Sequence, residues 1–200
     1  MITHRKSVPP VIRLVVNTEF ILAADPRAYI HNDLVRTYRM SVMAIYECNR
    51  YVFEEVQVGT IQIKILRSGV ALNLGYDPAE LANEVSHDAS MIYEALQEDL
   101  GSMSDGLQQD CLIISHLSFE APYRGSPLEL NTIRTALIGL SSGVSRAFLP
   151  LSVINPDIKP TDFKEMNSTA LHFDKIGFKP LKLGSNTLWL DLELRSFWNA

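Results

Sequence analysis

Cysteine is scarce in this chain, which has two among its 200 residues. A small domain stapled by disulfides is therefore excluded, because such scaffolds need several cysteine pairs. Cys48 and Cys111 lie far apart in the sequence, and each sits in or beside an apolar run. The count alone allows one disulfide, but the apolar surroundings favour buried free thiols in a reducing compartment. We therefore expect a cytoplasmic protein.

Long apolar runs and basic runs are also missing. No stretch approaches the roughly 20 apolar residues that span a bilayer. Arg5 and Lys6 are not followed by the apolar segment of a signal peptide. The net charge is −5 and the pI is about 5.5, and such a surface repels phosphate backbones on average. We therefore expect no membrane partner and no nucleic-acid partner.

Metal-ligand spacing is absent as well. The histidines are His4, His31, His87, His116 and His172. They form no pair such as H-x-x-x-H, and the chain has no G-x-S-x-G nucleophile elbow. We therefore expect no metal site, while a Ser-His or Cys-His pair stays open.

Apolar residues are plentiful, at 46% of the chain, and only 20% of the residues are charged. Two hundred residues of this composition can bury one sizeable core. We find no internal repeat, no low-complexity tract and no linker long enough to divide the chain. The sequence therefore predicts a single domain over residues 1–200.

Apolar alternation predicts three strands in the first half, over residues 11–16, 40–46 and 56–66. In the last of these strands the apolar parity switches at Gly59, which predicts a β-bulge. Residues 78–100 predict one long helix with an apolar stripe at three- and four-residue steps. Asp77 is its N-cap, Pro78 takes the first helical position and Glu80 completes a capping box.

The second half of the chain alternates between strands and helices. Strands are predicted over residues 111–119, 147–154 and 187–195, and helices over residues 127–141 and 167–176. Gly143 and Gly177 follow the two helices as stop signals. This alternation indicates an α/β or α+β fold, with helices packed on a sheet. The short stretch before the last strand suits an antiparallel edge.

Two segments of this half contain motifs of a known family. Residues 119–129 read F-E-A-P-Y-R-G-S-P-L-E, and residues 167–178 read N-S-T-A-L-H-F-D-K-I-G-F. The first resembles the V-x-P-x-Y-R-G strand end and the Q/R-x-x-G-x-G/A loop of the GNAT superfamily of N-acetyltransferases. The second resembles the family's N-x-x-A segment and its L-Y-E-K-x-G-F ending. Their order extends the resemblance over residues 111–195.

The resemblance implies a GNAT-like fold with a mixed, mostly antiparallel central sheet flanked by helices. It also implies transfer of an acyl group from acetyl-CoA, or another acyl-CoA, to an amine of a small molecule or a protein. Arg124 and the amides around Gly125 and Ser126 would hold the CoA phosphates, and backbone donors beside Phe119 would grip pantetheine. Because family members often pair through their late strands, a homodimer is implied too.

Candidate catalytic residues lie at the end of the predicted strand 111–119. Glu120 and His116 are the two side chains there that could take a proton from an amine. Alternation places both on one face with Ser118, which is also the pattern of a plain solvent-facing strand. Residues 18–38 are short for the family's substrate lid, so the resemblance does not identify the acceptor.

The chain departs from the family pattern at both motifs. Pro127 and Glu129 replace the loop glycines, and Phe173 falls where many members use a tyrosine to protonate the departing thiolate. Pro127 has no N–H to offer, and a like charge about 4 Å from a phosphate costs about 1 to 4 kcal/mol. The sequence S-P-L-E also reads as a capping box, in which Glu129 accepts from the Ser126 N–H.

These departures support an alternative function. A helix that satisfies its own first N–H groups needs no phosphate. The chain would then be a catalytically inactive GNAT-like binding or assembly module. The acidic, glutamine-containing segment over residues 97–110 is a candidate contact surface, although a solvated loop explains its composition equally well.

Overall fold

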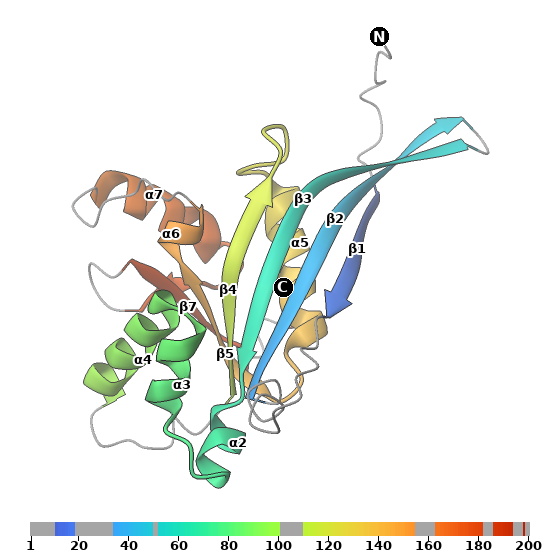
Figure 1. Cartoon of the computed structure of the whole chain (residues 1–200). Coiled ribbons are helices and arrows are strands. Elements are labelled where there is room, and N and C mark those ends of the chain that lie inside the picture. The colour runs from blue at the N-terminus through green and yellow to red at the C-terminus, as the bar shows by residue number, and fades with distance from the viewer. Residues whose placement is uncertain are drawn as a thin grey trace.

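The computed structural model describes residues 11–18, 34–49, 52–100, 110–154, 163–181, 186–193 and 198 (Figure 1). Its strands are β1 (Val11–Thr18), β2 (Val35–Asn49), β3 (Val52–Leu66), β4 (Asp110–Phe119), β5 (Val144–Pro150), β6 (Lys179–Pro180) and β7 (Thr187–Asp191). Its helices are α2 (Ser68–Asn73), α3 (Pro78–Val85), α4 (His87–Leu100), α5 (Pro127–Leu140), α6 (Leu151–Ile154) and α7 (Phe163–Asp174). None of these described helices is both long enough and apolar enough to cross a membrane.

The seven strands form one sheet in the order β1-β2-β3-β4-β5-β7-β6. Neighbouring strands are antiparallel except β4 and β5, which run parallel. A parallel pair needs a crossover connection, and α5 provides it between the end of β4 and the start of β5. The predicted α+β fold with a mixed, mostly antiparallel sheet flanked by helices is therefore confirmed.

The last strand does not lie at the edge of the sheet, so that prediction is wrong. β7 lies between β5 and β6 and is antiparallel to both. The edge position is taken by Lys179 and Pro180, which form the two-residue strand β6. A short strand with an exposed lysine and proline is typical of a sheet edge. It has no apolar alternation, so the pattern did not reveal it.

The hairpin of β2 and β3 contains the predicted bulge. Its register shifts by one residue between Val42 and Met43 of β2, which leaves Val58 as the extra residue in β3. Glycine is required at the next position because a Cβ on Gly59 would lie 2.7 Å from the carbonyl oxygen of Ser118 in β4. The bulge therefore brings the backbones of β3 and β4 close together near the end of β4.

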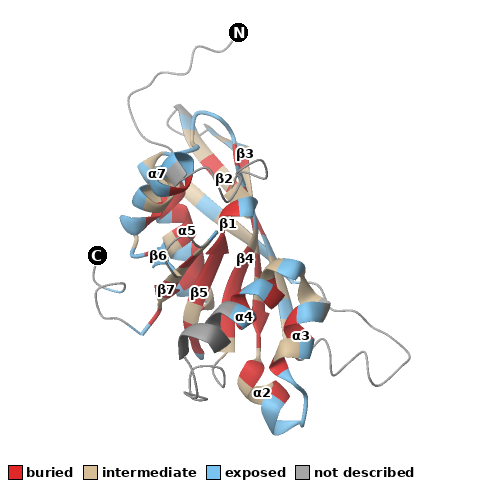
Figure 2. Cartoon of the chain, turned by 90° about the vertical axis from the view of Figure 1, so that its left-hand side faces the viewer, coloured by how far each residue is buried: buried red, intermediate tan, exposed pale blue. Residues whose placement is uncertain are grey.

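The core lies on both faces of the sheet. On one face, Leu130, Ile133 and Leu137 of α5 form an apolar stripe that packs on buried side chains from β2 to β5. On the other face, Ala82 of α3 and Ile92 of α4 pack against β4 and β5. Figure 2 shows buried residues along the central strands and exposed residues on the outer sides of the helices.

The helix predicted over residues 78–100 is interrupted, so that prediction is wrong in part. Ser86 has an extended backbone and separates α3 from α4. Its hydroxyl accepts a hydrogen bond of 3.2 Å from an N–H in the first turn of α4, as an N-cap does. Lys64 of β3 donates to the Val85 carbonyl at the end of α3, at 3.0 Å. Asp77 caps α3 as predicted.

Other element boundaries also differ from the prediction. β2 and β3 begin earlier than predicted, and β7 ends at Asp191 instead of residue 195. The strand predicted over residues 147–154 ends at Pro150, and its last residues form α6. A short apolar run does not distinguish a strand from a helix by periodicity, which explains the difference. α7 begins at Phe163, before the predicted start at residue 167.

Some expectations fall on residues that the structure does not describe. These are residues 19–33, residues 101–109 and the side chain of Cys48. Within the described part of the chain, Cys111 is a buried free thiol, as the composition predicted.

Candidate functional site

The two parallel strands at the centre of the sheet separate along their length. Pairing between β4 and β5 extends from Asp110 to Ile113 on β4, and β4 continues to Phe119 without a further β5 partner. Figure 1 shows β5 leaning away from β4 toward α6, and α6 lies against β4. Among the strands described, residues 114–119 of β4 therefore pair with β3 only, and the register skips Ser115.

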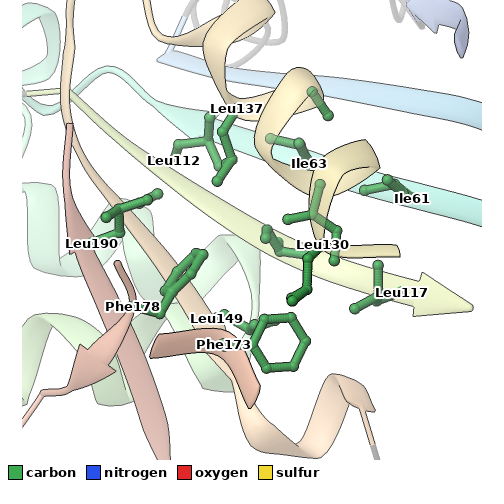
Figure 3. Close-up of a cluster of buried hydrophobic side chains, with 14 of the residues drawn as sticks. Ile61, Ile63, Leu112, Leu117, Leu130, Leu137, Leu149, Phe173, Phe178 and Leu190 are labelled. Carbon is green, nitrogen blue, oxygen red and sulfur yellow. The ribbon is translucent and has the colours of Figure 1, made fainter. Parts of the chain in front are cut away.

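Apolar side chains fill the space beside this separation on the α5 face of the sheet. Figure 3 shows Phe173 of α7 close to Leu117, Leu130 and Leu149. Phe173 is 1% exposed, and its ring meets the Phe178 ring edge-on, with the centroids 6.2 Å apart. Phe173 is therefore a core residue. A phenylalanine has no proton to give, so this position offers no acid.

The turn that follows β4 is held by its own side chains. Arg124 donates from Nη2 to the Phe119 carbonyl at 3.2 Å, which closes the turn back onto the strand. The Tyr123 hydroxyl is hydrogen-bonded to the hydroxyl of Tyr46 on β2. The structure therefore brings the predicted cofactor residues Phe119 and Arg124 together, but through a contact with each other.

Ser126 caps α5 as predicted. Its hydroxyl accepts from the Glu129 N–H at 3.3 Å, and Pro127 occupies the first helical position. The predicted partner of the Glu129 side chain is wrong. The carboxylate accepts from the Gly125 N–H at 2.5 Å, while the Ser126 N–H donates to the Tyr123 carbonyl at 3.2 Å. Gly125 has φ +71°, a backbone conformation that glycine adopts without strain.

Glu129 is a buried carboxylate, only 5% exposed, although it lies in the first turn of a helix. Its Oε2 atom is 3.4 Å from Nε2 of His172 on α7. That nitrogen is shielded from solvent and has no hydrogen-bond partner. The first-turn position stabilises a negative charge through the helix dipole. The contact between Glu129 and His172 shows that α7 lies next to the start of α5.

The N–H groups at this helix start are mostly committed within the chain. Gly125 donates to Glu129, Ser126 donates to Tyr123, and Glu129 donates to Ser126. Pro127 has no N–H at all. A phosphate at this helix start would compete with the Glu129 carboxylate for its donors and would face a like charge.

The candidate catalytic residues lie on the other face of β4. His116 and Glu120 are exposed, and the imidazole Nε2 is 3.1 Å from the Thr60 hydroxyl on β3. The register aligns polar residues across three strands in two adjacent rows, Arg39–Gln62–His116 and Ser41–Thr60–Ser118. The structure therefore places His116 in a polar face of the sheet, away from the contacts that Arg124, Gly125 and Ser126 make.

Sequence reasoning missed the partners of two of these residues. Thr60 follows the bulge, so its position opposite Ser118 and next to His116 depends on the register of β3 and β4. His172 lies in the second family-like segment, but the distance between α7 and α5 has no signal in local periodicity. The capping pattern around Ser126 placed Glu129 in the first turn of a helix, but no local pattern predicted that its side chain is buried.

A second set of polar residues lies where β4 begins, and we assign it a structural role. Asp110 is 3.7 Å from the guanidinium of Arg67, and burial raises the pKa of this carboxyl above its usual range. Burial also raises the pKa of the Cys111 thiol to about 12. The Tyr93 hydroxyl is hydrogen-bonded to Ser68, and burial raises the pKa of this phenol. Because the thiol stays protonated at neutral pH, Cys111 is not an activated nucleophile.

Among the described side chains, no group of three or more histidine, cysteine, aspartate or glutamate residues could hold a metal ion. No protein-family model, curated protein or solved structure matches the chain. The geometry around β4 and α5 is therefore what bears on function.

Proposed function

We propose that the protein is an N-acyltransferase of the GNAT type, which transfers an acyl group from an acyl-CoA such as acetyl-CoA to an amine in the cytoplasm. The observation that carries this proposal is the separation of β4 from β5 after Ile113. Support also comes from the mixed sheet, in which α5 joins the single parallel pair. The two family-like motifs span the end of β4 with the start of α5, and α7.

The pantetheine arm of CoA matches the side of β4 that has no strand partner after Ile113. The arm is extended and contains two amides, and an extended ligand can add to a sheet edge through main-chain hydrogen bonds. Residues 114–119 of β4 have no β5 partner there, so their backbone groups on that side are candidates to bind the arm. The carbonyl of Phe119 is already an acceptor for Arg124, which fixes the end of this edge.

The amine would approach from the polar face of the sheet. The α5 face beside the separation is filled by Phe173 and its apolar neighbours, whereas His116 and Ser118 are exposed on the opposite face. His116 would take a proton from the amine as its nitrogen attacks the thioester carbonyl. The new C–N bond forms, the C–S bond breaks, and the imidazolium returns the proton to the thiolate, since Phe173 has none to give.

Replacement of His116 tests this assignment. His116→Ala should lower the rate of acetyl-CoA-dependent thiol release with amine acceptors by about 100-fold or more, with little change in acetyl-CoA binding. His87→Ala, at an exposed histidine on α4, is the matched control and should leave the rate unchanged. A His116→Ala rate equal to that of the unmodified protein would exclude His116. Glu120→Ala would then test the second exposed base.

A second function is favoured by one specific contact. The Glu129 carboxylate already accepts the Gly125 N–H at the helix start where the family binds diphosphate. This helix start needs no bound phosphate, which favours a catalytically inactive GNAT-like binding or assembly module that pairs as a homodimer. Acetyl-CoA at millimolar concentration should then give no thermal shift and no heat. Light scattering should give the mass of a dimer for a module that pairs with itself.

A further inference from the structure

The start of α5 already holds an anion that belongs to the chain. The Glu129 carboxylate accepts the Gly125 N–H at 2.5 Å and lies 3.4 Å from Nε2 of His172. Glu129 is 5% exposed, so this charge is a built-in part of the packed helix start. Phosphate binds helix starts because their N–H groups and dipole favour negative charge. At the start of α5 the negative group is the Glu129 carboxylate of the chain itself.

Moving the carboxylate aside for a phosphate is unfavourable for two reasons. His172 Nε2 is buried without a hydrogen-bond partner, and the Glu129 carboxylate is 3.4 Å away, so this nitrogen would lose a polar neighbour if the carboxylate moved. The Gly125 N–H would also lose its acceptor until the phosphate replaced it. With Glu129 in place, a diphosphate would meet a like charge and few open donors, because Pro127 offers none.

We infer that Glu129 is a specificity-determining residue for the acyl donor. The protein binds acyl thioesters of pantetheine, and the nucleotide diphosphate of CoA adds no binding affinity. This rests on the proposed function, because it presupposes that the uncharged pantetheine arm binds along residues 114–119 of β4. Acetyl-CoA is then a donor through its pantetheine arm alone. The donors that fit this inference share the acyl-pantetheine thioester, which is either free or attached to a single phosphate.

A donor series titrated by calorimetry tests this inference. The probes are acetyl-pantetheine, acetyl-4′-phosphopantetheine and acetyl-CoA. For the unmodified protein, the Kd values of acetyl-CoA and acetyl-pantetheine should agree within about threefold. Glu129→Gln keeps the size and an acceptor oxygen but removes the charge, and it should tighten acetyl-CoA binding about tenfold, with acetyl-pantetheine unchanged.

Two further variants serve as controls for this experiment. Glu80→Gln is the matched control, because Glu80 occupies the same first-turn position of α3 but is exposed. It should leave all three Kd values unchanged. Glu129→Asp keeps the charge and should retain the pattern of the unmodified protein. If Glu129→Gln fails to fold, the three Kd values of the unmodified protein still show whether the diphosphate of CoA adds binding affinity.

Each outcome supports or overturns the inference. Acetyl-CoA bound by the unmodified protein tenfold more tightly than both other donors would overturn it and leave the proposed function standing. Tighter binding of acetyl-4′-phosphopantetheine alone supports it and identifies a carrier-bound arm as the source. Absence of binding by all three donors would end both this inference and the proposed function.

Discussion

The starts of α3 and α5 have the same capping pattern and different surroundings. α3 begins D-P-A-E and α5 begins S-P-L-E, with Asp77 and Ser126 as the N-caps and a proline in the first turn of each. Each cap accepts a hydrogen bond from a first-turn N–H. Yet Glu80 is exposed, whereas Glu129 is buried against Gly125 and His172.

The difference comes from what packs on each helix start. Leu81 of α3 belongs to a small cluster with Leu34 and Ala71 near the end of the sheet. Leu130 of α5 belongs to the largest cluster of the molecule as described, and α7 packs beside it. The local pattern therefore sets how the helix begins, while the tertiary contacts decide whether its glutamate is a surface charge or a buried one.

Truncation of the two matched leucines should give the largest difference. Leu81 and Leu130 follow the glutamates directly, and both are 5% exposed. Leu130→Ala should lower the free energy of unfolding by about 4 kcal/mol, because its large cluster cannot close around the cavity. Leu81→Ala should cost about 2 kcal/mol, since a small cluster relaxes more easily. Urea unfolding measures both. Equal losses would contradict the contrast between the two sites.

Replacement of the two glutamates should give the next largest difference. Glu129→Ala should lower the free energy of unfolding by about 2 kcal/mol, because a buried charge-assisted hydrogen bond is lost. Glu80→Ala should change it by less than about 0.5 kcal/mol.

The caps provide the control for this comparison. Asp77→Ala and Ser126→Ala should each cost about 1 kcal/mol. A Glu80→Ala loss as large as that of Glu129→Ala would mean that first-turn position alone, and not burial, explains the effect.

Much of the fold could be predicted from the sequence because it follows from local rules. Strand alternation, the Asp77 and Ser126 caps and the parity switch at Gly59 all correspond to features of the structure. The break at Ser86 was not predicted, because the apolar stripe continues across it and the contact that Lys64 makes with the end of α3 comes from a distant strand.

The candidate site was less predictable than the fold. Strand alternation placed His116 on an exposed face, and the structure agrees. The capping box identified Ser126 but gave the wrong partner for Glu129, because Gly125 lies in a turn with positive φ that redirects its N–H. The approach of His172 to Glu129 depends on how α7 packs, which no local pattern encodes.

The proposed function depends on one physical feature, a side of β4 without a strand partner that can bind an extended thioester. Amide hydrogen exchange with and without acetyl-CoA tests it most directly. Saturating acetyl-CoA should slow exchange within residues 114–119 of the central strand β4 and leave the edge strand β1 unchanged. Unchanged exchange in β4 at millimolar acetyl-CoA, or slowing confined to β1, would contradict the account.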